Sequence, residues 1–135
     1  VNLYREAFRM NSKPDAVYIE SISALTLATS DIARAVNFYQ LLGFQLARGD
    51  IDTKFVTFRA GDQYLNITME RPEREPCWWG RAIFYVNDVD AIYMRAISNK
   101  LDPDFAPRDA VWGERYFHIT DPDGHELSFA RRLQD

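Results

Sequence analysis

Residues Ala24–Val36 read ALTLATSDIARAV, and a related pattern, RAIFYVNDVDAIY, returns over Arg81–Tyr93. The two stretches match in a constant register, with Asp31 and Asp88 57 residues apart. A repeat of this size indicates two copies of one supersecondary unit. Equivalent positions of two such copies converge on a shared site, so the repeat also indicates where chemistry should be sought.

A second pair of matching segments extends the repeat towards the C-terminus. QYLNI over Gln63–Ile67 returns as HELSF over His125–Phe129, 62 residues later. Alternating apolar and polar residues predict strands in these segments and at the start of each copy. Three strands are expected after each helix, over 44–49, 54–60 and 64–70 in the first copy and 107–112, 114–120 and 126–130 in the second.

A helix is expected after the first strand of each copy. Asp31, or the adjacent Ser30, caps the first helix, because short polar side chains accept hydrogen bonds from the free amides of a first turn. This helix should end before Gly43, and the second should run from Asp88 to about Asn99. The predicted fold class is therefore α+β, with two βαβββ repeats that form a curved mixed sheet shaped as a cup.

The length of 135 residues indicates one domain, and a hydrophobic content of 47% is typical of a folded protein. Residues 1–21 stand outside the repeat as an N-terminal extension, with a short helix expected to end near Asn11 and Met10 as an alternative natural start. The single domain is expected over 22–131, with modules over 22–70 and 80–131 and a linker over 71–79.

Charge and composition argue against several classes of partner. The net charge of −4 and a pI of about 5.2 provide no basic footprint for nucleic acid. No apolar run reaches the length of a membrane span, so we expect no membrane partner. The single cysteine, Cys77, excludes an internal disulfide framework and a cysteine zinc site, and it is compatible with a cytoplasmic location.

Strand alternation also predicts which side chains line the cup. Apolar residues at every second position should lie under the helices, and the intervening residues should face the opening. A face that mixes polar and aromatic groups suits a ligand better than solvent alone. The residues expected on this open face are Phe55, Thr57, Arg59, Tyr64 and Asn66 in the first copy and Tyr116, His118, Thr120, Glu126 and Ser128 in the second.

Two motifs resemble the vicinal oxygen chelate superfamily, which includes glyoxalase I, extradiol dioxygenases, fosfomycin-resistance enzymes and bleomycin-resistance proteins. They are LATSDIARAVNFYQLLGF over Leu27–Phe44 and FHITDPDGHELSF over Phe117–Phe129. The resemblance covers about residues 22–131. It is specific for the fold and poorly specific for function, because this fold hosts many chemistries.

The resemblance implies four metal-ligand positions, which are usually occupied by His, Glu or Gln. They fall on Ala24 and Arg81 in the first strands and on Asn66 and Ser128 in the last strands. Alanine has no donor atom, arginine is cationic, and serine is a weak neutral ligand. We therefore expect no metal ligands at these positions and no divalent-metal cofactor.

A relocated metal site would have too few donors in the sequence. His118 should lie across from Ser128 on the neighbouring strand, and Glu126 shares their facing. These two supply two donors at most, and the sequence shows no third. The turn residue His125 is expected to cap the turn or face solvent.

Arg81 and His118 are the polar candidates that remain in the cup. Arg81 could bind a carboxylate, phosphate or enolate oxygen, or could form an ion pair with Glu126. His118 could act as a general acid or base, since its ordinary pKa lies near neutrality, or could be a hydrogen-bonded structural residue. We treat His118 as the candidate catalytic residue.

Aromatic residues complete the expected binding site. Trp79 has the parity of Arg81 and should wall the cup, whereas Trp78 should point to the helix side or to an interface. Trp112 and Tyr116 are further aromatic candidates. The expected ligand-binding residues are Arg81, Asn66, Ser128, Trp79, Tyr116, Glu126 and Thr57.

Three functions fit this pattern. The first is a metal-independent protein of the bleomycin-resistance type that binds a drug or metabolite, with a homodimer as the expected assembly. The second is a lyase, isomerase or dioxygenase-like enzyme that uses Arg81 and His118 or an unconventional metal site. The third is an interaction module whose cup is filled by its own side chains. The cup could close within one chain or across a dimer.

Overall fold

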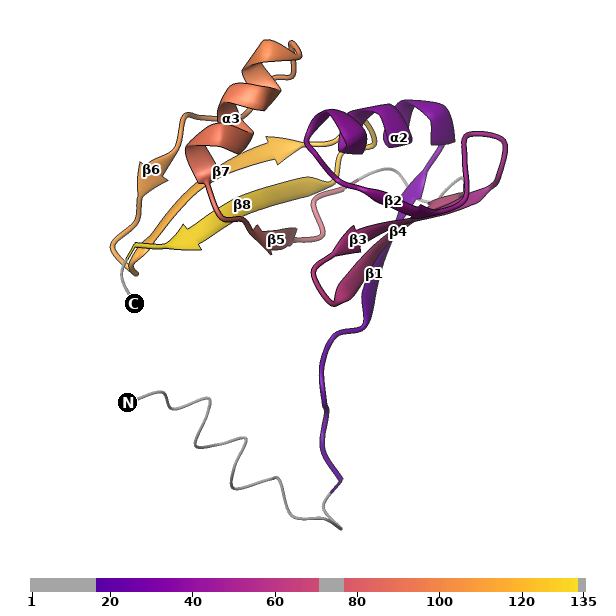
Figure 1. Cartoon of the computed structure of the whole chain (residues 1–135), viewed down its shortest axis with the longest axis horizontal. Coiled ribbons are helices and arrows are strands. Elements are labelled where there is room, and N and C mark those ends of the chain that lie inside the picture. The colour runs from indigo at the N-terminus through magenta and orange to yellow at the C-terminus, as the bar shows by residue number, and fades with distance from the viewer. Residues whose placement is uncertain (1–16, 71–76, 134–135) are drawn as a thin grey trace.

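The computed structural model describes residues 17–70 and 77–133 and contains two four-stranded mixed sheets (Figure 1). The helix expected near Asn11 and the 71–76 part of the linker lie outside the described residues. The first module contains β1 (Ala24–Thr29), α2 (Ile32–Leu41), β2 (Leu46–Arg48), β3 (Phe55–Ala60) and β4 (Gln63–Met69), and the second contains β5 (Arg81–Tyr85), α3 (Val89–Ser98), β6 (Arg108–Asp109), β7 (Glu114–Thr120) and β8 (Glu126–Arg132).

The two modules have the same topology. Their strand orders are β1-β4-β3-β2 and β5-β8-β7-β6. The first strand of each module pairs in parallel with the last, and the remaining pairs are antiparallel. The α+β class and the two βαβββ modules predicted from the repeat are confirmed. No helix in the described part of the chain is long and apolar enough to cross a membrane.

Two of the predicted strands are shorter than expected. β2 begins at Leu46 rather than at residue 44, and its register with β3 shifts between Leu46 and Arg48. β6 contains only Arg108 and Asp109 of the expected 107–112 stretch. Pro107 has no amide hydrogen to donate to a neighbouring strand, and a turn closed by Gly113 follows, which explains the truncation.

Both helices begin as the sequence predicts. The carboxylate of Asp31 accepts a hydrogen bond from the amide of Arg34 at 3.1 Å, and Asp88 does the same for Ala91 at 3.0 Å. Each contact satisfies an amide that has no partner within the helix. After α2 the chain turns at Gly43, whose φ of +103° lies in the region that glycine adopts most readily.

The core is continuous across both modules, because α2 and α3 lie on the same side of the sheets (Figure 1). Phe44 connects them, with its ring 5.1 Å from Phe84 and 6.1 Å from Phe129. The residues predicted to lie under the helices are buried there, which confirms the assignment of the two faces. They are Val56, Phe58, Leu65 and Ile67 in the first module and Phe117, Ile119, Leu127 and Phe129 in the second.

The turn between β7 and β8 docks onto the first module. Asp123 in this turn accepts hydrogen bonds from the Thr29 hydroxyl at 2.5 Å and the Ser30 amide at 3.1 Å, and it forms an ion pair with Arg34 at 2.8 Å. These contacts hold the second module against the start of α2. Gly124 has the positive φ, +91°, that the sequence predicts for this turn.

Candidate functional site

The polar residues on the open face of the first module bind to one another. The Thr57 hydroxyl donates to Asn66 Oδ1 at 2.8 Å, and Asn66 Nδ2 donates to Thr26 Oγ1 at 3.2 Å. Thr57 is buried, and Ala24 carries no polar group. This part of the expected ligand set therefore forms a neutral hydrogen-bonded row rather than a group of free donors.

Arg81 and Glu126 form an ion pair on the open face of the second module. The two residues are direct neighbours on β5 and β8, and Arg81 Nε lies 2.9 Å from Glu126 Oε2. The same oxygen accepts a hydrogen bond from Trp78 Nε1 at 2.8 Å. The hydrogen bond from Trp78, assisted by Arg81, holds the pKa of Glu126 below its usual value despite partial burial. The ion pair with Glu126, one of the two alternatives for Arg81, is present, and the binding of an anion by Arg81 stays a prediction.

His118 lies beside this pair on β7. Its Nδ1 is 3.6 Å from Glu126 Oε1, too far for a hydrogen bond, and its ring packs 5.1 Å from Phe105 and 5.2 Å from Tyr116. Burial is the main reason that the pKa of His118 is lowered, and the charge of Arg81 adds to the effect. The imidazole is therefore predominantly neutral near pH 7, so its contact with Glu126 is not an ion pair there.

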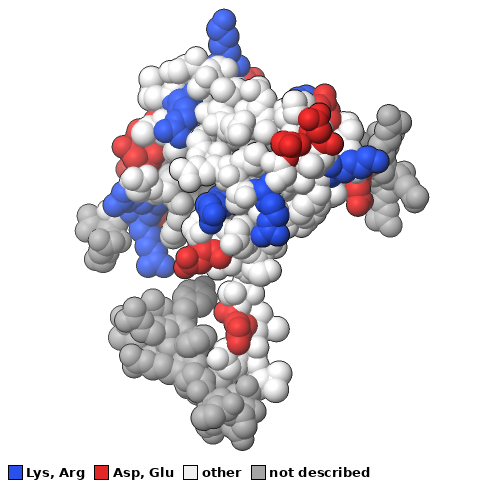
Figure 2. Space-filling view, turned by 45° about the vertical axis from the view of Figure 1, so that its right-hand side comes forward, with Lys and Arg blue, Asp and Glu red and all other residues white. Residues whose placement is uncertain are grey.

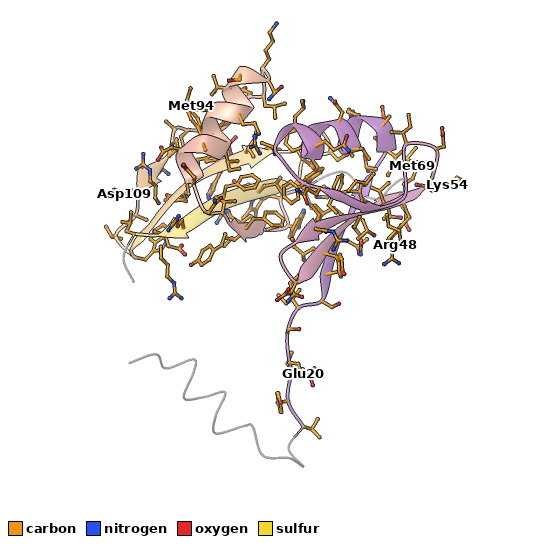
Figure 3. The ribbon with its side chains drawn as sticks, viewed as in Figure 1. Glu20, Arg48, Lys54, Met69, Met94 and Asp109 are labelled. Carbon is orange, nitrogen blue, oxygen red and sulfur yellow. The ribbon has the colours of Figure 1, made fainter. Side chains whose placement is uncertain are left out.

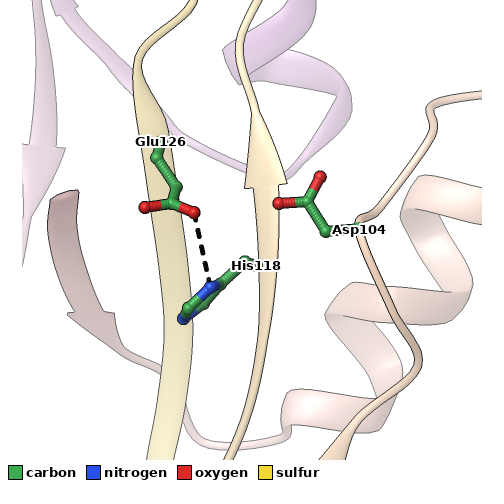
Figure 4. Close-up of side chains that lie close together, drawn as sticks. All are labelled: Asp104, His118 and Glu126. Carbon is green, nitrogen blue, oxygen red and sulfur yellow. Dashed lines mark ion pairs between the residues drawn. The ribbon is translucent and has the colours of Figure 1, made fainter. Parts of the chain in front are cut away.

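Asp104 supplies a third donor that the sequence reasoning missed. One ligand atom each from Asp104, His118 and Glu126 can be chosen so that all three lie within 4.8 Å of one another (Figure 4). The amide of Asp104 donates to the carbonyl oxygen of His118 at 2.8 Å, which fixes the loop beside β7. The expectation that the open face offers only two donors is thus wrong. No spacing in the sequence shows that this loop returns to β7.

An aromatic group continues the open face beyond His118. Phe105, Tyr116 and Trp112 are in contact, with ring centroids 5.5 Å apart in each neighbouring pair. Arg108 lies 3.7 Å above the Phe105 ring, and its Nε donates to the Tyr116 hydroxyl at 3.1 Å. Phe105 and Arg108 were not predicted as site residues, because the strand that carries Arg108 is only two residues long.

Trp78, rather than the expected Trp79, lies beside Arg81 and Glu126. Trp78 contacts Glu126 and lies under the Arg81 guanidinium at 5.6 Å, whereas Trp79 donates to His125 Nδ1 at 2.8 Å. β5 begins only at Arg81, and Gly80 has a φ of +128°, so strand parity does not extend back to Trp79.

His125 joins the two modules. Its Nε2 lies 2.9 Å from the carbonyl oxygen of Ala28, and its Nδ1 accepts the hydrogen bond from Trp79. It is partly buried, contrary to the expectation of a residue that caps the turn or faces solvent. Ser128 is only 3% exposed, so it offers little surface to a ligand on the open face.

An apolar cavity of about 720 Å³ lies between the two modules, and Arg81 is one of the residues that line it. Its volume falls within the usual range for small-molecule sites, and its wall is mostly hydrophobic. Arg59 and Arg95 also contribute to the wall. The principal apolar residues are Leu25, Phe44, Tyr64, Ile83, Phe84 and Phe129.

Charges of both signs are interspersed outside the site. One face shows Lys and Arg alternating with Asp and Glu rather than a patch of a single sign (Figure 2). Asp109 lies at the outer edge of the second module (Figure 3). It binds Arg115 at 2.9 Å, and Arg115 also binds Asp90 at 2.9 Å. Arg115 therefore neutralises two carboxylates and connects β7 to α3 and β6.

Comparisons with solved structures identify the same fold. TioX from Micromonospora sp. ML1 is 28% identical, with a TM-score of 0.65 over 84% of this chain and 100% of that chain. A bleomycin resistance determinant encoded on transposon Tn5 is 21% identical, with a TM-score of 0.69 over 85% and 100% of the two chains. Lactoylglutathione lyase from Agrobacterium tumefaciens is 20% identical, with a TM-score of 0.65 over 87% and 95%.

The family assignment rests on most of the chain. No curated protein matches it. Residues 21–129, which contain the first βαβββ module and the second as far as the middle of β8, match the model of one protein family. The chain belongs to the Glyoxalase/Bleomycin resistance protein/Dioxygenase superfamily.

Proposed function

We propose that this protein binds a small organic molecule in the cavity between its modules, without a metal ion at the family's usual positions. The observation that carries the proposal is the 720 Å³ apolar cavity bordered by Arg81. Apolar walls with a few polar groups at one end are typical of small-molecule sites. A metal ion at the usual positions has no support, because Ala24 and Arg81 offer no ligand atoms there.

The chemistry of the cavity favours a ligand with an apolar or aromatic body and one polar or anionic group. The apolar body would pack against Phe44, Phe84 and Phe129. The polar group would lie at Arg81. Its Nε binds Glu126, and its two terminal nitrogens have no hydrogen-bond partner within residues 17–70 and 77–133. A guanidinium with free N–H groups can donate two parallel hydrogen bonds to a carboxylate or phosphate.

A homodimer is part of the proposal. Ile83 and Tyr85 on β5 are 61% and 59% exposed, and Trp112 is 65% exposed, although all three are large and apolar. Within the described ranges, β5 pairs only with β8 and so leaves one edge free. Exposed apolar side chains beside a free strand edge favour association with another chain. A second copy could cover this surface and narrow the opening of the cavity.

We also propose a cytoplasmic location, with which the exposed thiol of Cys77 is compatible.

Ligand binding can be tested by titrating aromatic acids, cationic aromatics and neutral aromatics into the protein in the presence of EDTA. Tryptophan fluorescence reports binding, because Trp78 lies against Arg81. Arg81→Gln should weaken binding of the acids about tenfold or more, as expected for a lost charged hydrogen bond. Arg48→Gln, an exposed change on β2, is the matched control and should leave binding unchanged. Absence of binding across all three groups would contradict the proposal.

A second candidate function is metal-free acid–base catalysis by an enzyme of this fold. The observation that favours it is the neutral imidazole of His118, which faces a carboxylate and lies near Arg81. A neutral imidazole can accept a proton while a nearby guanidinium stabilises a developing oxyanion. His118→Gln should abolish turnover of a substrate and leave its binding largely intact. Equal turnover by the variant would exclude this role.

A further inference from the structure

We propose that Asp104, His118 and Glu126 bind one divalent transition-metal ion on the open face of the second module. The inference goes beyond the proposed binding of an organic ligand and does not depend on it. The site is also displaced from the family's four ligand positions, since none of its three residues occupies them. On β8, the carboxylate stands at Glu126, two residues before the small hydroxyl group of Ser128.

The three side chains offer a suitable set of donors. Two carboxylates and one imidazole match the preferences of Zn²⁺, Mn²⁺ and Co²⁺. Their ligand atoms lie within 4.8 Å of one another. An ion with bonds of roughly 2.0–2.2 Å separates its ligands by at most about 4.4 Å. Small side-chain rotations would therefore suffice to close the three groups around an ion.

The contacts around Glu126 leave one oxygen for the ion. Oε2 is held by Trp78 at 2.8 Å and by Arg81 at 2.9 Å. Oε1 faces His118 at 3.6 Å, a separation that exceeds a direct hydrogen bond and fits two ligands of one ion. Hydrogen bonds to the second oxygen of a carboxylate orient it for metal binding in many proteins.

The backbone positions the other two ligands. His118 stands across from Ser128 in the antiparallel β7–β8 pair, and its side chain is 15% exposed. Asp104 is held next to it by the main-chain hydrogen bond to the His118 carbonyl oxygen at 2.8 Å. The Asp104 carboxylate is exposed and points towards the other two groups (Figure 4). Three protein ligands leave coordination positions open for water or for an oxygen of a bound molecule.

Nearby positive charge would limit the affinity of the site for metal ions, and its imidazole would set the selectivity among them. The two carboxylates of the set offset the charge of a divalent ion, whereas Arg81 and Arg108 lie nearby and oppose it. Oxygen-only ions such as Mg²⁺ and Ca²⁺ gain little from an imidazole donor. We therefore expect Zn²⁺ and Co²⁺ to bind and Mg²⁺ to bind much more weakly.

The test uses the full chain, stripped with EDTA and titrated with ZnCl₂ and CoCl₂ by calorimetry. One equivalent should bind, and Co²⁺ should give visible absorption bands characteristic of mixed nitrogen and oxygen ligation. Asp104→Asn and His118→Gln should each weaken binding about tenfold or more. Asp102→Asn, the same change at an exposed position of the same loop, should bind as the unchanged protein does.

Two further observations separate this site from other causes of binding. The chain has only two histidines, so NMR should show Zn²⁺ shifting the His118 imidazole signals and leaving those of His125 unchanged. Trp78→Phe should weaken binding while circular dichroism shows an unchanged fold. Absence of binding at millimolar metal, or equal binding by Asp104→Asn, would overturn the proposal. Organic-ligand binding in EDTA is a separate readout, so the two proposals can fail independently.

Discussion

The hydroxyl of Tyr39 in α2 donates a hydrogen bond to the buried carboxylate of Asp121, 82 residues later in the chain, at 2.7 Å. The other oxygen of Asp121 accepts hydrogen bonds from the amides of Asp123 and His125, at 2.9 Å each. Tyr39 thus connects α2 of the first module to the turn of the second. Removing its hydroxyl leaves part of a buried carboxylate without a donor.

Tyr39→Phe should reduce the free energy of unfolding by about 1–3 kcal/mol at pH 7, the usual effect of leaving a buried partner unsatisfied. Urea unfolding monitored by circular dichroism measures the change. Tyr85→Phe is the matched control, because Tyr85 is exposed and should contribute much less. An equal loss of unfolding free energy in both variants would show that the buried hydrogen bond to Asp121 stabilises the protein no more than a hydroxyl at the surface does.

The stabilising effect of Tyr39 should decrease at alkaline pH. Burial and the adjacent Asp121 raise the pKa of Tyr39 well above its usual value of 10.0. Above pH 10 the unfolded chain releases this proton while the folded chain retains it, so unfolding becomes more favourable as pH rises. The difference in stability between the natural protein and Tyr39→Phe should therefore shrink between pH 9 and pH 11. A constant difference over this range would contradict the pKa shift.

Gly43→Ala should destabilise the protein by about 1–3 kcal/mol, because φ at this position is +103°. A Cβ atom there would lie 1.9 Å from the Arg95 guanidinium, which donates to the carbonyl oxygen of Leu42 at 3.2 Å. Thermal unfolding measures the loss. Gly61→Ala is the control, since φ there is +62° and, among the described residues, no atom beyond its chain neighbours lies within 4 Å of the added carbon. Adding Arg95→Ala to the first variant should relieve the steric part only.

His118 should titrate below the ordinary histidine pKa of 6.5, because burial and then Arg81 disfavour its charged form. Below pH 6.5 the unfolded state binds this proton more readily than the folded state, so stability should fall as the solution is acidified. NMR of the imidazole protons gives the midpoint directly. Arg81→Gln should raise the midpoint, and an unchanged or lower value would show that Arg81 does not act on His118.

The hydrogen bond from Trp78 to the Glu126 carboxylate gives a related prediction. Trp78→Phe removes the hydrogen bond that contributes most to lowering the pKa of Glu126, so the pKa should rise. Carbon-detected NMR of the Glu126 carboxyl group measures this shift. Trp79→Phe is a matched control, because Trp79 binds His125 instead. If both variants shift the pKa of Glu126 equally, the assignment of this hydrogen bond to Trp78 is incorrect.

Much of the fold followed from local patterns. Asp31 and Asp88 cap their helices in the structure as their positions before apolar periodic segments predict. The alternation over β7 and β8 correctly separated the buried Phe117 from the open-face His118. These features depend on residues close together in sequence, so single-sequence reasoning can reach them.

The candidate site was predicted less completely. The ion pair between Arg81 and Glu126 was foreseen as one of two alternatives, because strand alternation placed both residues on the open face of the second copy. Asp104 and Trp78 were missed as site residues. Asp104 lies on a loop whose path depends on a main-chain hydrogen bond to β7. Trp78 comes before Gly80, whose positive φ interrupts the alternation of the strand.

The sequence by itself determined the two-module architecture, because the register of the repeat sets the order of the strands and helices. The lack of metal ligands at Ala24 and Arg81 stays a prediction, because the resemblance to the superfamily, rather than the repeat, defines those positions. Only the tertiary structure decided where the remaining polar groups meet. The cavity between the modules and the meeting of Asp104, His118 and Glu126 depend on how loops and sheets pack across long sequence separations. Periodicity places a side chain on a face, whereas packing decides which other side chains it meets there.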